Sequence, residues 1–391
     1  MKAIFHFLFL LLMENFIVSA RKYRPAKFLD VVGQEQVSET LKKALSSGKL
    51  AQSFLFCGPR GVGKTTCARI LAKAINCENP SADFEPCNEC NSCVSFSQNA
   101  SFNIFELDAA SNNSVEDIRT LVEQVRFAPQ SGKYKVYIID EVHMLSSGAF
   151  NAFLKTLEEP PSYAIFILAT TEKHKIIPTI LSRCQIFDFK RIADKDIVKQ
   201  LQKICDNEGV AAEASALHVI AQKADGGLRD ALSLFDKIVS YAGKKLTYQD
   251  VIKNLNILDH DYYFKVTEYF MLEDASSVLL AFNEIINNGF DGEMFLLGIA
   301  EHFRNLLICK DEKTSTLLEV ADDVKENYVK QAGLTNETFL LNALNIINQC
   351  DIDYKTAKNK RLLVELALLK ICFLNTQIEN TLSVILGEKK N

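Results

Sequence analysis

The sequence contains no tryptophan, only six histidines and no excess of basic residues. The 44 Lys and Arg residues are outnumbered by 49 Asp and Glu residues, which gives a net charge of −5. This charge excludes a protein whose surface is mainly basic. An assembly could still bind nucleic acid on a local basic surface. Eleven cysteines among 391 residues are too few for a disulfide scaffold. A hydrophobic share of 48% and a charged share of 24% exclude intrinsic disorder, collagen and coiled-coil rods. The length predicts two or three domains.

The first half of the chain alternates short apolar runs with helical patterns. The apolar runs predict strands at 53–57, 104–107, 136–139, 165–168 and 186–189. Helices are expected between them, over 64–76, after Ser114 and over 149–157. Continuous apolar strands that alternate with helices are typical of a parallel sheet covered on both faces.

The pattern changes at about Asp194, beyond which only helical periodicity remains. Amphipathic helices are expected over 194–206, 213–224 and 228–241, and helical periodicity continues through 264–288, 294–307 and 336–374. We therefore predict an α/β domain over 13–192, a small helical domain over 193–255 and an all-α domain over 256–391, preceded by an apolar extension over 1–12.

A glycine-rich loop lies between the first strand and the helix after it. Residues 58–65 read Gly-Pro-Arg-Gly-Val-Gly-Lys-Thr, which matches the G-x-x-x-x-G-K-[ST] motif in its required place. The backbone N–H groups of such a loop surround phosphate oxygens, and the helix N-terminus adds positive potential. Lys64 would reach the β- and γ-phosphates, and Thr65 would ligate Mg²⁺. The residues expected to bind ATP here are Gly58, Pro59, Arg60, Gly61, Val62, Gly63, Lys64, Thr65 and Thr66.

An acidic pair follows the strand at 136–139. Asp140 comes at the carboxyl end of the strand, where ligands of open α/β sheets bind, and Glu141 follows it. Asp140 can hold Mg²⁺ together with Thr65, and Glu141 can orient and deprotonate the attacking water. Together with Lys64 these two acids are the predicted catalytic residues of an ATPase.

Four cysteines form a cluster with two consecutive C-x₂-C steps, at Cys77, Cys87, Cys90 and Cys93. Four thiolates make a closed, structural Zn²⁺ site, which leaves no position for a catalytic water. An iron–sulfur cluster is the alternative, since four cysteines also hold such clusters. The polar, loop-like surroundings favour zinc, and the module should not be needed for the ATPase chemistry itself. By contrast, the six histidines show no spacing typical of a metal site. His143 is expected to have a structural role.

Several segments, in order along the chain, resemble the bacterial DNA polymerase III gamma/tau family of the AAA+ class. The resemblance runs from about Met13 into the third domain and is carried by the glycine loop, the four cysteines and residues 21–25, 30–34, 140–145, 157–161, 169–171, 182–184 and 227–232. It implies an α/β P-loop (AAA+) domain with a parallel sheet, a small helical lid domain and an all-α collar domain that oligomerises.

The same resemblance implies roles for further residues. Arg24 and Val32 would border the adenine, and Thr171, with Thr170 beside it, would be sensor 1, which reads the γ-phosphate. Arg183 would be an arginine finger that acts on ATP bound by the adjacent subunit, and Arg229 would be sensor 2. From the residues alone, Arg183 could equally be a surface arginine, and Arg229 could form a salt bridge with Asp230.

The function implied by the resemblance is that of an ATP-hydrolysing clamp-loader subunit. It would open a ring-shaped sliding clamp and place it on primed DNA, as part of the DNA polymerase III holoenzyme but without a polymerising site of its own. The implied cofactors are ATP, Mg²⁺ and Zn²⁺. The implied partners are the other subunits of a hetero-oligomeric clamp loader, the sliding clamp, primed-template DNA and the polymerase holoenzyme, with no membrane and a cytoplasmic location.

Two alternative functions belong to other classes. The Asp-Glu-Val-His box at 140–143 resembles that of a DExH helicase, but the helical second half offers no second α/β motor domain. The second alternative is an AAA+ ring subunit with a purely structural role. The presence of Lys64, Thr65 and the acidic pair argues against this alternative.

The two ends of the chain depart from the family pattern. Residues 3–12 are almost wholly apolar but too few to span a bilayer, which needs about 20 residues. A secretory signal cleaved after Ala20 or an ordered apolar arm is possible on this pattern, but we expect an upstream extension before an internal start at Met13. At the other end the chain stops at Asn391, which suits a gamma-type form or a truncated tau-type form.

Overall fold

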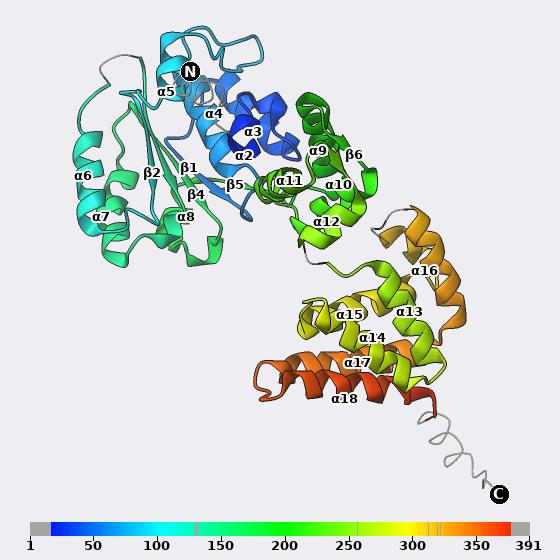
Figure 1. Cartoon of the computed structure of the whole chain (residues 1–391). Coiled ribbons are helices and arrows are strands. Elements are labelled where there is room, and N and C mark those ends of the chain that lie inside the picture. The colour runs from blue at the N-terminus through cyan, green and yellow to red at the C-terminus, as the bar shows by residue number, and fades with distance from the viewer. Residues whose placement is uncertain are drawn as a thin grey trace, which may run out of the picture. The chain divides into compact units, whose positions relative to one another are not determined.

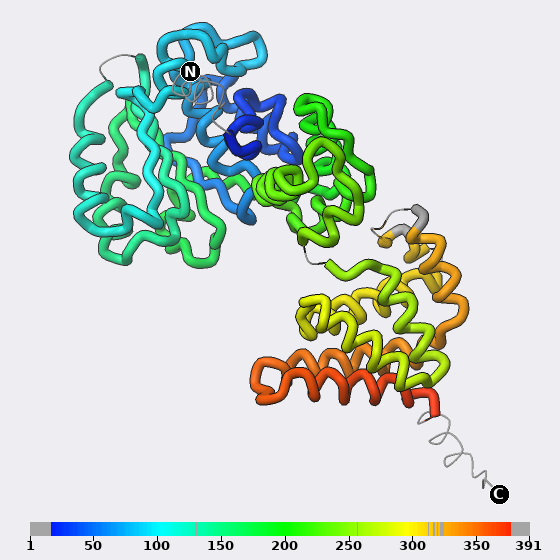
Figure 2. The backbone as a smooth tube through the Cα atoms, viewed as in Figure 1, coloured from blue at the N-terminus to red at the C-terminus, as the bar shows by residue number. Residues whose placement is uncertain are grey.

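The computed structural model describes residues 17–376 apart from 130, 131, 256, 312, 319 and 321. The apolar extension over 1–12 and the proposed start at Met13 lie outside the described residues. The chain forms two compact units, which divide between Leu246 and Thr247. Figures 1 and 2 show an α/β part followed by helices in the first unit and helices alone in the second.

A five-stranded parallel sheet forms the centre of the first unit, in the order β2-β3-β4-β1-β5. The strands are β1 (Ser53–Cys57), β2 (Ile104–Asp108), β3 (Lys135–Asp140), β4 (Ala164–Thr170) and β5 (Gln185–Asp188). Each of the five predicted strands is present, to within one or two residues at its ends. β1 and β4 are buried at every residue, as their continuous apolar sequences predict.

Helices cover both faces of this sheet, which confirms the α/β prediction. Phe54 and Phe56 face a core with α3 (Glu35–Ser46), α4 (Lys64–Asn76) and α5 (Asn91–Ser97). Leu55 and Cys57 face the opposite core, with α6 (Val115–Val125), α7 (Ser147–Glu158) and α8 (Pro178–Leu181). The alternation follows from the two-residue period of a strand, and Figure 1 shows the two helical layers.

The rest of the first unit is a helical subdomain after β5. It contains α9 (Asp194–Glu208), α10 (Ala214–Lys223) and α11 (Leu228–Ala242), close to their predicted bounds. A two-stranded parallel pair, β6 (Ala211–Ala212) and β7 (Lys245–Leu246), is an addition that the sequence did not predict. The short helix α2 (Ser19–Lys22) packs against α11.

The second unit is entirely helical within the described residues. Its helices are α12 (Tyr248–Leu255), α13 (His260–Met271), α14 (Ala275–Asn287), α15 (Gly292–Ile308), α16 (Asp322–Leu334), α17 (Glu337–Tyr354) and α18 (Lys360–Cys372). The stretch 264–288 therefore contains most of α13 and all of α14, and the stretch 336–374 contains α17 and α18. Asp274 and Asn359 cap the second helix of each pair by accepting from Ser277 N and Leu362 N.

Aromatic side chains fill the core of this helical unit. Phe270, Phe282, Phe295 and Phe303 are all buried there. Among the described residues, every helix is too short or too polar to span a lipid bilayer.

Candidate nucleotide site and metal centre

The glycine loop connects the carboxyl end of β1 to the first turn of α4. Gly58 has φ of 151°, and a Cβ placed there would lie 2.4 Å from the carbonyl oxygen of Phe189. Gly63, at φ 103°, immediately precedes the first residue of α4, Lys64. The loop can therefore follow its path only with glycine at its start, and it leads directly into a helix N-terminus, where anions are stabilised.

A cavity of about 480 Å³ opens beside this loop. Its lining includes most residues predicted to bind ATP or to act in catalysis: Arg24, Val32, Arg60, Gly61, Val62, Gly63, Lys64, Thr65, Thr66, Asp140, Glu141 and Arg229. Gly58, Pro59, Thr170, Thr171 and Arg183 are not among the lining residues. The structure thus brings together residues from the segment before α3, the glycine loop, the end of β3 and the start of α11.

Sequence reasoning missed several other residues that line the cavity: Ala20, Tyr23, Pro25, Val31, Asp108, Ala110, Ile192, Leu228 and Leu232. Asp108 ends β2 as Asp140 ends β3, so the strand-end rule could have found it. Leu228 and Leu232 lie one turn apart on α11, a spacing that puts them on one helix face. Nothing in the sequence distinguishes these two leucines from ordinary core residues.

Lys64 is folded back onto its own loop. Its Nζ donates to the carbonyl oxygens of Gly58 at 2.7 Å and Pro59 at 2.6 Å, and the residue is only 5% exposed. Burial lowers the pKa of Lys64, while Glu141 and Asp140 act in the opposite direction. The ammonium group therefore lies at the glycine loop and is bonded to backbone carbonyls.

The two predicted metal ligands contact each other directly. Thr65 Oγ1 donates to Asp140 Oδ2 at 2.6 Å, across the gap between α4 and β3. Asp140 Oδ1 accepts from the backbone N–H of Glu141 at 3.0 Å. A hydroxyl and a carboxylate so placed offer hard oxygen ligands of the kind that Mg²⁺ prefers, so this pair fits the ion.

Glu141 has an unusual backbone and a well-defined partner. Its φ of 47° and ψ of 44° lie in the left-handed region, which is rare for a residue with a side chain. Glu141 Oε2 accepts from Thr171 Oγ1 at 2.9 Å and from Thr171 N at 3.2 Å. The predicted sensor threonine therefore lies against the predicted catalytic acid, just outside the cavity lining.

His143 and Thr170 lie behind this acid. Thr170 is completely buried, and its Oγ1 lies 3.1 Å from His143 Nδ1. The His143 ring also lies 3.4 Å from Glu141 Oε2 and 3.3 Å from Glu172 Oε1. These contacts place His143 as a support for the acidic residues.

The two predicted arginines lie in different environments. Arg229, the second residue of α11, lines the cavity, and its backbone N–H donates to Gly61 O at 3.3 Å. In the described part of the chain it makes no ion pair with Asp230. Arg183, in contrast, pairs with Glu158 Oε1 at 2.7 Å and donates to Thr179 O at 2.7 Å.

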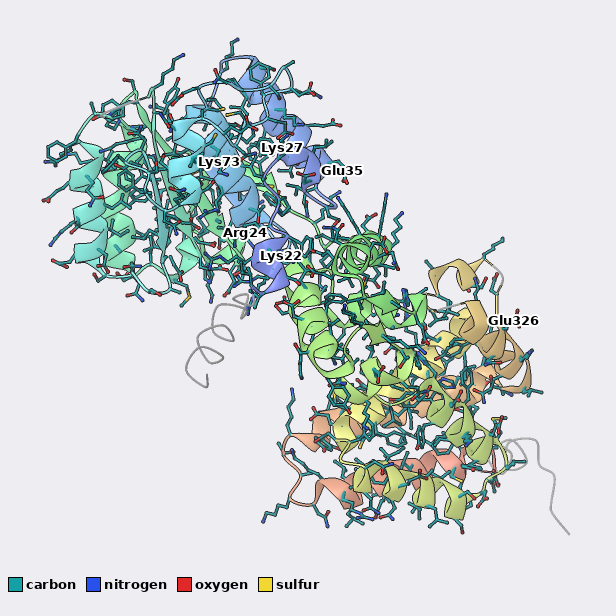
Figure 3. All side chains as sticks on the ribbon, turned by 45° about the horizontal axis from the view of Figure 1, so that its top comes forward. Lys22, Arg24, Lys27, Glu35, Lys73 and Glu326 are labelled. Carbon is teal, nitrogen blue, oxygen red and sulfur yellow. The ribbon has the colours of Figure 1, made fainter. Side chains whose placement is uncertain are left out.

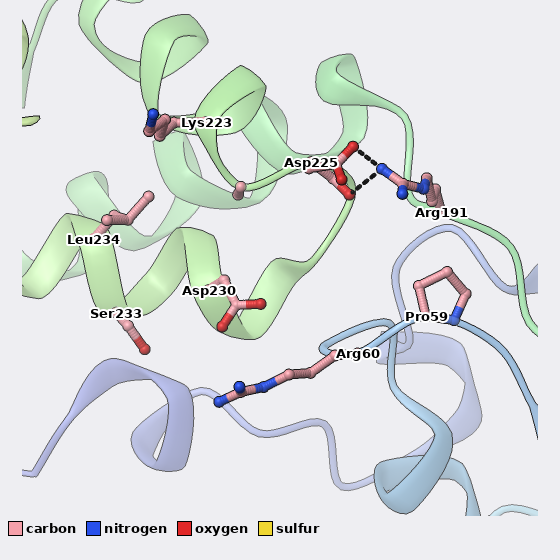
Figure 4. Close-up of a pocket in the computed structure, with 9 residues that line it drawn as sticks. Pro59, Arg60, Arg191, Lys223, Asp225, Asp230, Ser233 and Leu234 are labelled. Carbon is pink, nitrogen blue, oxygen red and sulfur yellow. Dashed lines mark hydrogen bonds and ion pairs between the residues drawn. The ribbon is translucent and has the colours of Figure 1, made fainter. Parts of the chain in front are cut away.

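A second cavity, of about 540 Å³, lies next to the loop on the side of the helical subdomain. Figure 4 shows the side chain of Arg60 below Asp230 and Ser233 of α11, and Pro59 of the same loop on the side of Arg191. Arg191 forms an ion pair with Asp225 across the same region. Charged side chains therefore lie on both sides of the glycine loop, in this second cavity and in the first one.

The four predicted cysteine ligands come together at the end of α4, in the segment that follows it and in the first turn of α5. One sulfur from each of Cys77, Cys87, Cys90 and Cys93 lies within 4.8 Å of the others. The backbone N–H groups of Glu89 and Cys90 donate to Cys87 Sγ and lower the pKa of this thiol to about 6. Burial acts in the opposite direction on Cys77 and Cys93 and raises the pKa of each thiol. The fit to a four-coordinate metal ion therefore rests on the mutual distances of the four sulfur atoms.

The cysteine module, defined as residues 77–93, is held against α4, one of the helices that cover the sheet. Lys73 of α4, labelled in Figure 3, donates to Asn88 Oδ1 at 2.9 Å. Arg69 of α4 lies over the ring of Phe96, 4.5 Å from its centroid, and Phe96 belongs to α5, which also contains Cys93 of the module. The module is therefore attached to α4, the helix that begins at the glycine loop.

Three consecutive parts of the chain match protein families that are described as DNA polymerase III subunits or domains. Residues 33–193 match the family described as DNA polymerase III, delta subunit. Residues 196–244 match the ATPase lid domain of the DNA polymerase III clamp loader subunit, and residues 246–384 match domain III of DNA polymerase III subunits gamma and tau.

Similar chains cover most of this sequence. It is 44% identical over 355 residues to DNA polymerase III subunit tau of Bacillus subtilis, which is 90% of this chain and 62% of that one. It is 44% identical over 283 residues to subunit tau of Escherichia coli, or 72% of this chain and 44% of that one. It is 35% identical over 367 residues to DNA polymerase III subunit gamma of Buchnera aphidicola, or 93% of this chain and 98% of that one. The chain thus spans only part of the tau relatives and nearly all of the gamma relative.

Proposed function

Because the chain belongs to the DNA polymerase III gamma/tau family, we propose that it is the ATP-binding and ATP-hydrolysing motor subunit of a clamp loader. The observation that carries the proposal is the convergence of Lys64, Thr65, Asp140, Glu141 and Arg229 around one cavity. In this role the chain uses ATP to load a sliding clamp onto primed DNA, next to the other loader subunits and the polymerase holoenzyme.

Binding of ATP begins at the glycine loop. The N–H groups of the loop and the N-terminus of α4 receive the phosphates, and the lining of Arg24, Val31 and Val32 borders the base. Lys64 must leave the carbonyls of Gly58 and Pro59 to reach the phosphates. Charge on the incoming phosphates favours this exchange, because an ammonium–phosphate contact is stronger than a bond to a neutral carbonyl.

Hydrolysis then depends on the acidic pair. Thr65 and Asp140 would hold Mg²⁺, which neutralises charge that develops on the phosphates. Glu141 accepts a proton from the attacking water, and Thr171 controls where its carboxylate points. Thr171 bonded to Glu141 is a resting arrangement, and a γ-phosphate that takes over Thr171 frees the acid for water.

Arg183 acts on a neighbouring subunit in this proposal. Its side chain pairs with Glu158 and does not line the cavity of its own chain, which supports a role elsewhere. A planar guanidinium supplied by a neighbour stabilises charge on the γ-phosphate only after assembly. Arg229, in contrast, acts on the nucleotide of its own chain.

We further propose that the cysteine module holds one Zn²⁺ through Cys77, Cys87, Cys90 and Cys93, as a closed structural site. Residues 13–192 act as the ATPase domain, 193–255 as the lid and 256–391 as the oligomerising collar. This scheme assigns α12 (Tyr248–Leu255) to the lid, whereas the compact units divide before it, between Leu246 and Thr247. A cytoplasmic location goes with the replication role.

The decisive experiment is an ATPase assay of the assembled clamp loader, with and without sliding clamp and primed template. We expect hydrolysis to rise when both are present and to need Lys64. Stimulation by single-stranded nucleic acid alone, with unwinding of duplex, would favour a helicase. Binding of ATP without turnover under all conditions would favour a structural ring subunit.

A further inference from the structure

The chain segment that borders the base-binding side of the cavity is fixed at two places. At its start, α2 is held to the helical subdomain, where Ser19 N donates to Asp236 Oδ2 at 2.6 Å and Lys22 Nζ pairs with Glu208 Oε1 at 2.6 Å. Figure 3 labels Lys22, the last residue of α2, and Arg24, two residues further along the chain. The second place lies after Arg24, at the cysteine module.

A buried carboxylate makes this second attachment. Glu85 is 7% exposed and lies in the cysteine module. Its Oε2 accepts from Phe28 N at 2.7 Å, and its Oε1 accepts from Leu29 N at 3.1 Å. Lys42 of α3 places its Nζ 2.5 Å from the same Oε1 and balances the charge. Asn88 of the module adds a longer contact, from its Nδ2 to Ala26 O at 3.4 Å.

The two backbone groups that Glu85 accepts from begin a single 3-10 turn, Phe28–Asp30. N–H groups in the first turn of a helix have no partner within it, so they need an outside acceptor. The turn leads directly into Val31 and Val32, which line the cavity. The Phe28 side chain is 1% exposed and belongs to the core under the sheet. Glu85 therefore sets the path of the backbone immediately before the two valines.

We propose that Glu85 is a positioning residue for the nucleotide, which makes nucleotide affinity depend on the folded cysteine module. This inference rests on the proposed function, since it assigns a role to a residue that supports the same cavity. The carboxylate touches neither phosphate nor base. It keeps the segment from Ala26 to Val32 in the arrangement that accepts the base, and the metal-binding cysteines on either side keep Glu85 in place.

The expected size of the effect follows from the fraction of molecules with this segment in place. Apparent affinity falls in proportion to the binding-competent fraction, so a segment that is ordered about one tenth of the time raises Kd about tenfold. The turnover rate at saturating ATP should stay unchanged, because the bound nucleotide restores the order. This split between Kd and kcat separates Glu85 from the catalytic residues.

The test compares Glu85→Gln with Glu89→Gln in the full chain. Glu89 is an exposed acid of the same module, so its change alters charge equally without touching the segment. We would measure zinc content, the Kd of a non-hydrolysable ATP analogue with Mg²⁺, and hydrogen exchange of residues 26–32. Glu85→Gln should raise Kd about fivefold to tenfold and speed the exchange while zinc is retained. Glu89→Gln should leave all three unchanged.

Removal of the metal from the wild-type chain by a chelator provides the second arm. It should raise Kd and the exchange rate about as much as Glu85→Gln does, and should add less than twofold in Kd to that variant. If Glu85→Gln itself loses zinc, the test rests on the comparison of the wild-type chain with and without metal.

Three results are distinguishable. A zinc-loaded Glu85→Gln chain with wild-type Kd and exchange overturns the inference, and so does a metal-stripped wild type with both unchanged. Loss of nucleotide binding in the metal-loaded wild type would refute the proposed function instead, and the exchange data would then decide the role of Glu85.

Discussion

Replacement of Arg183 by alanine separates action on a neighbour from action on the chain's own nucleotide. In the isolated chain Arg183 pairs with Glu158, and the two side chains are 32% and 48% exposed. Surface pairs of this kind contribute about 0.2–1 kcal/mol, so Arg183→Ala should lower the free energy of unfolding by less than about 1 kcal/mol. ATP affinity of the isolated chain should not change, because Arg183 does not line the cavity. In the assembled loader, clamp- and DNA-stimulated hydrolysis should fall by roughly a thousandfold, the lower end of the effect of an arginine finger.

A mixing assay tests the direction of this effect. Subunits with Arg183→Ala combined with subunits with Lys64→Ala should regain some hydrolysis, because each type supplies the group that the other lacks. Glu158→Ala is the matched control, since it breaks the same ion pair but keeps the arginine, and it should retain activity. The reasoning fails if Arg183→Ala weakens ATP binding by the isolated chain. It fails equally if assembled mixtures with alternating neighbours stay as inactive as either variant alone.

Three further outcomes are expected. Lys64→Ala should abolish ATP binding measured by calorimetry, whereas Glu141→Gln should bind ATP without turnover, and normal turnover in the latter would remove Glu141 from the mechanism. Purified chain should contain about one Zn²⁺ by elemental analysis, and Cys90→Ser should lose it, so an iron–sulfur absorption band or full metal content in that variant would contradict the assignment. Burial lowers the pKa of His302 to about 4, so the unfolded chain binds more protons between about pH 4 and 6.5, and stability should fall as pH drops through this window by up to about 3 kcal/mol. Denaturant unfolding should show a shallower slope in His302→Gln than in the wild type, because burial also lowers the pKa of His260, which both chains keep.

Much of the fold could be predicted because its strands are strongly marked. β1 and β4 are short runs of apolar residues, and both are buried throughout. The pair of β6 and β7 contains two residues a strand, too few for any periodicity to show. The break between α13 and α14 has no glycine or proline, and depends instead on Glu273 at φ 53° and the Asp274 cap. A polar cap within a continuous helical pattern is easily overlooked.

Some residues of the candidate site could likewise be predicted from the sequence, and others could not. Lys64 and Asp140 could be found because backbone geometry requires them at a fixed place after a strand. The partner of Glu141 could not, since Thr171 approaches it from the neighbouring strand and only the sheet order β3-β4 brings the two together. Glu85 gives no sequence sign at all. Its importance comes from two backbone groups 57 and 56 residues earlier in the chain.

The contact between Gly58 and Phe189 has a genetic consequence. The atom that a Cβ at position 58 would strike is the carbonyl oxygen of residue 189, which every amino acid carries. A second-site suppressor of a Gly58 substitution should therefore not arise by exchange of the side chain at 189. At Gly226 the nearest obstacle is instead the Cβ of Arg191, a side-chain atom. We expect a suppressor screen to return revertants to glycine at position 58 and no exchanges at position 189.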